Sequence, residues 1–201
     1  WDDEINELLG VQPMSYDQAL TRALIKVDEN KVASSWKDSL VSGRFNTNIS
    51  KFLKVPKRGC FIDRRKKVLE NREFTIDRIW SIGGETGWYY GNWLWNFRGF
   101  IDQLFGGVGS RRGRTNKHDI HPGDALDFWR VLYANKEQGK LVLYAEMKLP
   151  GEAWLEFKII NNILYQAATF RPRGFWGKLY WYSVLPFHSF IFNGMLNKLI
   201  R

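Results

Sequence analysis

Two predicted neighbouring strands carry carboxylates that could exchange protons. Glu146 and Glu156 lie on either side of the segment LPGE at 149–152, which predicts a hairpin connection. Two carboxylates held close together push one pKa upward and can work as a general acid and base. Strand alternation places both on the face opposite the apolar one, where Arg130 and Lys148 would pair with them in a purely structural ion network. Glu146 and Glu156 are therefore candidate catalytic residues with a structural alternative.

Histidine is the second candidate for acid–base chemistry. His188 follows Pro186 at the expected start of the last helix, where it could face the mouth of a cavity and titrate near neutral pH. The alternative is a packed or capping histidine. His118, His121 and Asp119 lie in one polar loop, but a metal site needs several ligands in a fixed geometry. We expect no metal site in this chain.

A short basic run predicts anion binding. Arg111, Arg112 and Arg114 fall in SRRGR, and guanidinium groups hold phosphate or carboxylate through paired hydrogen bonds. The run lacks the GK[ST] ending of a nucleotide-binding loop. The alternative is a loop in which these arginines pair with nearby acids such as Asp102 or Asp124.

Tryptophan and glycine are concentrated in the middle of the chain. Eight of the ten tryptophans lie between Trp80 and Trp181, and ten of the eighteen glycines lie between Gly83 and Gly123. Bulky rings beside residues that permit sharp turns indicate a shaped interior, and such pockets bind small molecules. Aromatic residues among bases can also stack on single-stranded nucleic acid, but here they alternate with residues typical of a core. We do not expect nucleic-acid binding.

The elements that must position these side chains begin with helices and an edge strand. Ser15 and Gln18 have the spacing of a capping box at the start of a helix over 15–36. The basic segment 60–70 predicts a strand at a sheet edge, where Lys and Arg discourage further pairing. Apolar residues between 93 and 105 recur at helical spacing and end at a glycine pair.

The second half of the chain predicts two hairpins followed by a helix. The turn segments are 135–139 and Asn161–Asn162. Leu141, Leu143, Leu155 and Phe157 share one face by alternation. A final helix is expected to begin at Pro186, a residue suited to a first turn. Strands followed by an apolar helix predict an α+β fold in which an antiparallel sheet grips the helix.

Composition indicates one globular domain with an added segment. The chain has 201 residues, a net charge of +9 and 44% hydrophobic residues. Cys60 is the single cysteine, which suits a reducing cytoplasm. No apolar run reaches about 18 residues, so a membrane span is not expected. No signal peptide is recognisable, and a first residue other than Met indicates a segment of a longer chain.

Several motifs in order carry a family resemblance: GGETGWYYGNWLWNFRG, RRGR, GDALDFWRV, AEMKLPGEAWLEF, QAATFRPRGFWGKLYWY and PFH. From about residue 79 to 195 the chain resembles the family of domain of unknown function 2867. This resemblance implies a START-like or Bet v 1-like helix-grip fold, in which a curved antiparallel sheet wraps around a long C-terminal helix. It also implies a place after a Rossmann-type, epimerase/dehydratase-like oxidoreductase domain.

The resemblance sets the expected domain boundaries. Residues 1–55 would be a helical segment and linker that ends the preceding oxidoreductase domain, and residues 56–201 would be the START-like domain. No GxGxxG motif follows a strand here, so we expect no cofactor in this chain, with NAD(P) confined to the missing domain.

These observations favour binding of a small apolar or amphipathic ligand by an accessory domain. The expected ligand-binding residues are Trp88, Trp95, Arg98, Trp129, Arg130, Glu146, Trp154, Gln166 and His188. One alternative is an enzyme of the cyclase, isomerase or hydrolase type that uses Glu146, Glu156 or His188. The other is a structural module that docks on its oxidoreductase partner or on a second copy through exposed aromatic residues. Folds of this kind host many functions and do not choose between these readings.

Overall fold

The computed structural model describes residues 14–19, 55–107, 109, 113–114 and 119–201. The chain divides into two compact units, residues 1–35 and 36–201. In the first unit, the predicted capping box is present: the Ser15 amide donates to Gln18 Oε1 and the Gln18 amide donates to Ser15 Oγ, each over 3.3 Å. The remainder of the helix expected over 15–36 lies outside the described residues.

The second unit contains one antiparallel sheet with the strand order β1-β6-β5-β4-β3-β2. The strands are β1 (Phe61–Val68), β2 (Ala125–Leu126), β3 (Trp129–Asn135), β4 (Lys140–Ala145), β5 (Gly151–Ile160) and β6 (Ile163–Pro172). The basic strand β1 lies at an edge, as its Lys and Arg residues predict. Asn161 and Asn162 connect β5 to β6 with φ of 48° and 60°, a left-handed turn that asparagine tolerates.

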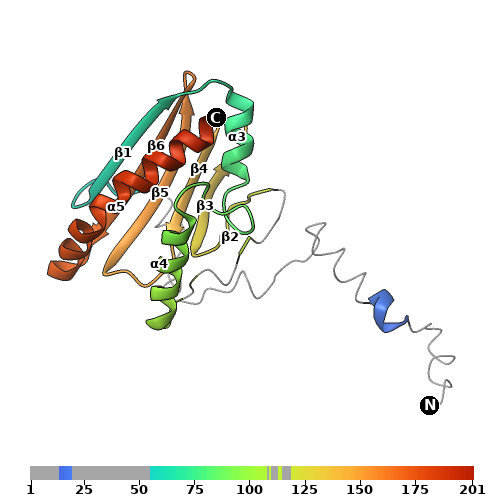
Figure 1. The fold of residues 1–201 in the computed structure, drawn as a ribbon, viewed down its shortest axis with the longest axis horizontal. Helices are drawn as coiled ribbons and strands as arrows, with labels where there is room; N and C mark the ends of the chain where they lie inside the picture. The colour runs from blue at the N-terminus through green and yellow to red at the C-terminus, as the bar shows by residue number, and fades with distance from the viewer. Residues whose placement is uncertain (1–13, 20–54, 108, 110–112, 115–118) are drawn as a thin grey trace, which may run out of the picture. The chain divides into compact units, whose positions relative to one another are not determined.

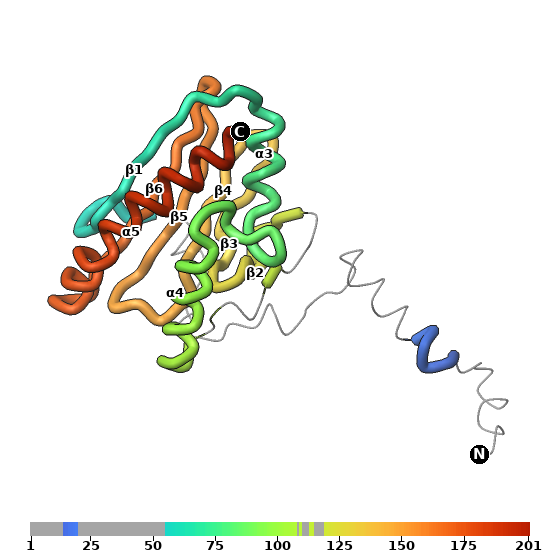
Figure 2. Tube along the Cα trace, in the orientation of Figure 1, coloured from blue at the N-terminus to red at the C-terminus, as the bar shows by residue number. Residues whose placement is uncertain are grey.

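Three helices accompany the sheet: α3 (Arg72–Trp80), α4 (Asn92–Leu104) and α5 (Gly174–Ile200). Figure 1 shows α5 lying diagonally across one face of the curved sheet, and the trace in Figure 2 follows the same path. The helix α5 contacts β1 and β6 of the sheet, and α3 contacts α5. The architecture is therefore the predicted α+β fold, a curved antiparallel sheet gripping a long C-terminal helix.

The helix α5 is longer than the sequence pattern suggested. It begins at Gly174 and continues through Pro186, which was expected in the first turn. Aromatic residues between 175 and 182 are typical of strands, yet Gly177, Trp181 and His188 recur at helical spacing and face the sheet. Pro186 removes one intrahelical hydrogen bond, the one that its missing amide would give to Tyr182.

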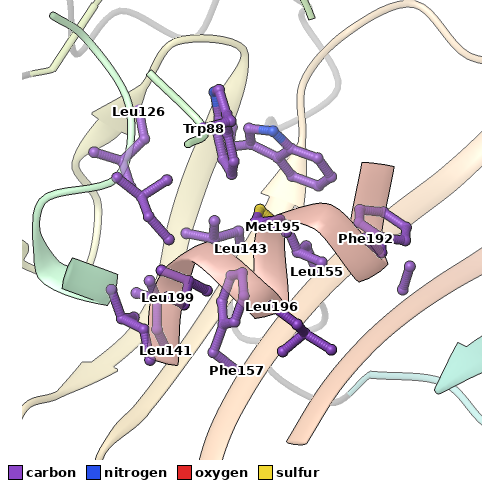
Figure 3. Packing of buried hydrophobic residues seen from close by; sticks show 14 of the residues in the cluster. Trp88, Leu126, Leu141, Leu143, Leu155, Phe157, Phe192, Met195, Leu196 and Leu199 are labelled. Atoms are coloured by element: carbon purple, nitrogen blue, oxygen red, sulfur yellow. The ribbon is translucent and has the colours of Figure 1, made fainter. Parts of the chain in front are cut away.

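The main core fills the space between the inner face of the sheet and the second half of α5. Figure 3 shows inward side chains of β4 and β5 meeting α5. Its members include Leu141, Leu143, Leu155, Phe157, Met195, Leu196 and Leu199, none of which is more than 1% exposed. The predicted alternation of apolar residues along β4 and β5 is thus confirmed. A second, smaller cluster on the opposite face contains Leu132, Val142, Tyr144 and Trp154.

A close approach joins the start of α4 to α5. A Cβ atom at Gly194 would lie 2.1 Å from Cδ1 of Tyr90, so only glycine allows this packing. Tyr90 also contacts Phe190, with ring centroids 5.0 Å apart. Trp95 of α4 approaches Phe192 of α5 at 6.4 Å. These contacts place α4 in the same helical layer as α5.

Candidate ligand-binding site

The strand register brings one amide side chain into the core beneath α5. Gln166 of β6 lies opposite Phe157 of β5 and opposite Arg65 of β1, so its side chain shares their inward face. It is only 2% exposed. Neither Oε1 nor Nε2 of Gln166 has a hydrogen-bond partner within the described part of the chain. A buried side-chain amide without hydrogen bonds costs about 1–3 kcal/mol of stability. This cost indicates that a water or a ligand group supplies the hydrogen bonds.

His188 projects from α5 toward the same region. Its ring packs edge-on against Trp181 with centroids 5.1 Å apart, and it lies 5.0 Å from the ring of Phe192. Burial lowers the pKa of His188 from 6.5 to about 4, so the imidazole is neutral at pH 7. Its Nδ1 is buried and has no partner among the residues described.

An ion pair on β1 lies beside these two groups. Arg65 donates to Asp63 over 2.9 Å, and both side chains are largely buried, at 18% and 11% exposure. Arg65 also donates to the carbonyl of Ser189 over 3.5 Å, which ties β1 to α5 next to His188. The pair is internally neutral, and the charges of Asp63 and Arg65 shift the pKa of His188 in opposite directions. The ion pair itself therefore adds no net charge beside Gln166.

Aromatic rings connect this region to a cleft at the start of α4. Trp95 contacts Phe192 on one side and Trp88 on the other, at 6.4 and 5.0 Å between centroids. Trp88 and Trp95 both line the cleft, which has a volume of about 700 Å³. The sequence predicted Trp88 and Trp95 as ligand-contacting residues, and both occupy a concave surface of the size that small ligands use.

Asp127 is the polar centre of the cleft. It accepts a hydrogen bond from the indole nitrogen of Trp88 over 3.0 Å and one from the Gly84 amide over 3.3 Å. Burial raises the pKa of Asp127, while these donors and Arg114 oppose the rise. Its φ of 53° is left-handed, a conformation costly for most side chains but tolerated by aspartate. A raised carboxyl pKa in a cleft suits proton transfer, which makes Asp127 a candidate general acid or base.

Of the three arginines predicted to bind anions, Arg114 alone is described; Arg111 and Arg112 lie outside the described residues. Arg114 Nη1 donates to the carbonyls of Trp80 and Ile82, each over 2.9 Å. Its largely buried guanidinium therefore holds the loop before the cleft, and burial lowers its pKa. The described contacts support a structural role for this side chain.

The predicted carboxylates lie on the outer face of the sheet, away from Gln166. Glu146 accepts two hydrogen bonds from Arg130, over 3.0 and 3.1 Å, in a buried bidentate pair. Glu156 lies opposite Val142, so about 13 Å of strand separates its position from that of Glu146 at 3.3 Å per residue. The two strands do form a hairpin, but their register does not bring the two glutamates together.

The remaining predicted residues are spread over three regions. Trp154 packs edge-on against Tyr144 on the outer face, at 5.5 Å. Trp129 lies on the inner face next to Trp88, at 5.9 Å, and its indole nitrogen is buried with no partner in the described residues. Arg98 of α4 donates to the carbonyl of Lys148 over 3.4 Å. The structure therefore groups Trp88 with Trp95 and Trp129, and it places Gln166 opposite Arg65, which contacts α5 next to His188.

The described part of the chain shows neither a metal-binding group nor a membrane-crossing helix. The described residues include no group of three or more His, Cys, Asp or Glu side chains arranged to hold a metal ion. None of the helices in the described ranges has the length and apolar character needed to cross a bilayer.

Comparison with known families identifies a matching family model. A family model described as a protein of unknown function, DUF2867, matches residues 57–195. No curated protein matches the chain. The match covers most of the chain, including the whole sheet, and the chain therefore belongs to this family.

Proposed function

We propose that this member of the DUF2867 family binds a small amphipathic molecule between the inner face of its sheet and α5. The observation that carries the proposal is the amide of Gln166, which is 2% exposed and lacks a partner at both of its polar atoms among the described residues. A ligand group that both donates and accepts hydrogen bonds would satisfy this amide and the free nitrogen of His188.

The electrostatics of the site favour an uncharged head group. His188 is neutral at pH 7 because its pKa is about 4, and Arg65 is already paired with Asp63. A charged ligand would enter this apolar region without a counter-ion, at a cost of several kcal/mol. A hydroxyl, an amide or a protonated carboxyl group meets the site without that cost.

The surroundings favour an apolar body on the ligand. Trp181 stacks on Phe61 at 5.4 Å and on Phe170 at 5.9 Å, and Phe192 closes the other side of His188. Aromatic walls with two or three convergent polar groups are typical of small-molecule sites. Within a longer protein, such a domain would serve as an accessory to a preceding Rossmann-type oxidoreductase.

A fluorescent probe tests the proposal. N-phenyl-1-naphthylamine is uncharged, amphipathic and brightens in apolar sites; we expect it to bind and to be displaced by 1-dodecanol better than by dodecanoate at pH 7. Gln166→Leu should weaken binding at least tenfold while the far-ultraviolet circular dichroism is unchanged. Tyr165→Leu, the neighbouring position on the opposite face, is the matched control. Equal binding by the Gln166 variant and the unmodified chain would refute the assignment.

A further inference from the structure

The helix α4 exposes the apolar stripe that would ordinarily face a core. Trp93, Phe97, Phe100 and Leu104 recur every three or four residues and are 56–68% exposed. The opposite side of the helix carries Trp95, which packs inward. An exposed aromatic stripe of this length marks a binding surface for a protein or a membrane.

Residues 174–190 of α5, here called its first half, show the same pattern. Phe175, Leu179, Tyr182 and Phe190 recur at helical spacing and are 50–71% exposed. They lie opposite Trp181, which is buried against the sheet. Because α4 and α5 occupy one helical layer, both stripes point away from the sheet on the same side. Tyr90 and Phe190, in ring contact at 5.0 Å, join them.

The two helices that carry these stripes expose no acidic side chain. The helix α5 contains no Asp or Glu, and the sole acid of α4, Asp102, is buried and accepts hydrogen bonds from the amides of Gly109 and Lys148. Arg173, Lys178 and Lys148 are exposed near the two stripes. A second copy docked by this same surface would bring like charges together, which disfavours self-association.

We propose that this surface, formed by α4 and the first half of α5, docks on an anionic lipid bilayer. Tryptophan, phenylalanine and tyrosine rings are favoured at the headgroup level of a membrane, and Lys and Arg beside them attract anionic lipids. The aromatic stripes would enter the interface while Arg173 and Lys178 contact headgroup phosphates. This inference does not depend on the ligand site under α5, because it uses the opposite side of the helices.

Vesicle binding with a positioned fluorophore tests the proposal. The full chain is prepared with Cys60→Ser and Leu179→Cys, and the new thiol is labelled with the environment-sensitive dye NBD. With vesicles of phosphatidylcholine and phosphatidylglycerol at 7:3, the NBD emission is expected to rise severalfold and shift to the blue. Pure phosphatidylcholine or 0.5 M salt should reduce binding at least tenfold, because screening weakens the attraction between bases and lipid. A label at Tyr165→Cys, on the far face of the sheet, should stay unchanged.

A second variant separates the membrane from other occupants. Phe175→Ser combined with Trp176→Ser removes two exposed rings, and co-sedimentation with the anionic vesicles should fall at least tenfold with the melting temperature retained. Three results would overturn the proposal: no binding to anionic vesicles at low salt, an equal response from the Tyr165→Cys label, or vesicle-free self-association in light scattering that the double variant abolishes. The last result would assign the surface to a second copy of the chain.

Discussion

The two halves of α5 use their apolar residues in opposite ways. In the second half, Met195, Leu196 and Leu199 are fully buried against the sheet. In the first half, Phe175 and Trp176 are each 71% exposed. One continuous helix therefore has a half whose side chains fold the protein and a half whose outward side chains contribute little to folding.

The sheet residues that pack against the two halves also differ. The second half rests on leucine and phenylalanine from β4 and β5 (Figure 3). The first half rests on Phe61 and Phe170, which stack on Trp181. Near its end, Arg65 of the pair with Asp63 donates to the carbonyl of Ser189, next to His188. The first half thus has exposed apolar side chains on its outer side and, among the described residues, buried polar groups without hydrogen-bond partners on its inner side. Both features are typical of binding regions.

The sharpest test of the comparison is one substitution made in each half. Leu199→Ala should lower the free energy of unfolding by about 2–5 kcal/mol, since it opens a cavity in the core. Leu179→Ala, at a residue that is 50% exposed, should change it by no more than about 0.5 kcal/mol. Urea unfolding followed by circular dichroism measures both. Similar losses for the two variants would mean that the first half is covered in the folded protein.

The next effect is a loss of stability in acid that originates in the first half. The folded pKa of His188 is about 4 and its ordinary value is 6.5. Below pH 6.5 the unfolded chain binds a proton that the folded chain does not, so the free energy of unfolding falls as the pH drops toward 4. The full difference corresponds to about 3 kcal/mol. Unfolding is measured from pH 7.5 to 4.

A pair of histidine variants isolates this contribution. His188→Gln should flatten the pH dependence between 6.5 and 4, whereas His121→Gln, at an exposed histidine, should leave it intact. Asp127 acts in the other direction, because its raised pKa favours the protonated folded state as the pH falls. Because both histidine variants retain Asp127, the difference between them cancels its contribution to the pH dependence of the unfolding free energy. An unchanged slope in His188→Gln would show that His188 is solvated in the folded protein.

A smaller effect is expected where the second half meets α4. Gly194→Ala places a methyl group against the ring of Tyr90 and should cost about 1–3 kcal/mol of stability. Asn193→Ala, at the exposed neighbouring position, is the control. Tyr90→Ala in the same chain should recover part of the loss, because the two positions share one contact. Thermal unfolding of the four proteins forms the cycle, and an additive result would contradict the contact.

The sequence was sufficient for the sheet, because strand alternation and turn residues are local signals. The apolar spacing of Leu141, Leu143 and Leu155 predicted the inner face, and Asn161–Asn162 predicted the turn between β5 and β6. The length of α5 could not be predicted from such local signals. Aromatic residues before Pro186 have strand propensity, and only packing against the sheet selects the helix.

The candidate site was predictable in part for the same reason. Gln166 was predicted among the polar groups of neighbouring strands. His188 was predicted because it follows Pro186 at the expected start of the last helix, but the structure places it inside α5. Whether Glu146 and Glu156 meet depends on the register of the hairpin, which residue spacing alone did not reveal. Burial raises the pKa of Asp127. The residue lies against Trp88 and Gly84, which are about 40 positions away in the chain, so this burial is not visible in the neighbouring sequence.

Among the test substitutions, the smallest expected change in stability is at Gln166, on the inner face of the sheet. Gln166→Leu should raise the free energy of unfolding by about 1 kcal/mol, because leucine fills a similar volume without an unsatisfied amide. Glu146→Gln is the contrasting change: it breaks a buried pair with Arg130 and should cost about 3–5 kcal/mol. Equilibrium unfolding at pH 7 without added ligand measures both. A Gln166 variant that is less stable than the unmodified chain would show that the amide already has a partner in the free protein. Gln166 would then stabilise the fold, as the pair of Arg130 with Glu146 does, and would not be available to bind a ligand.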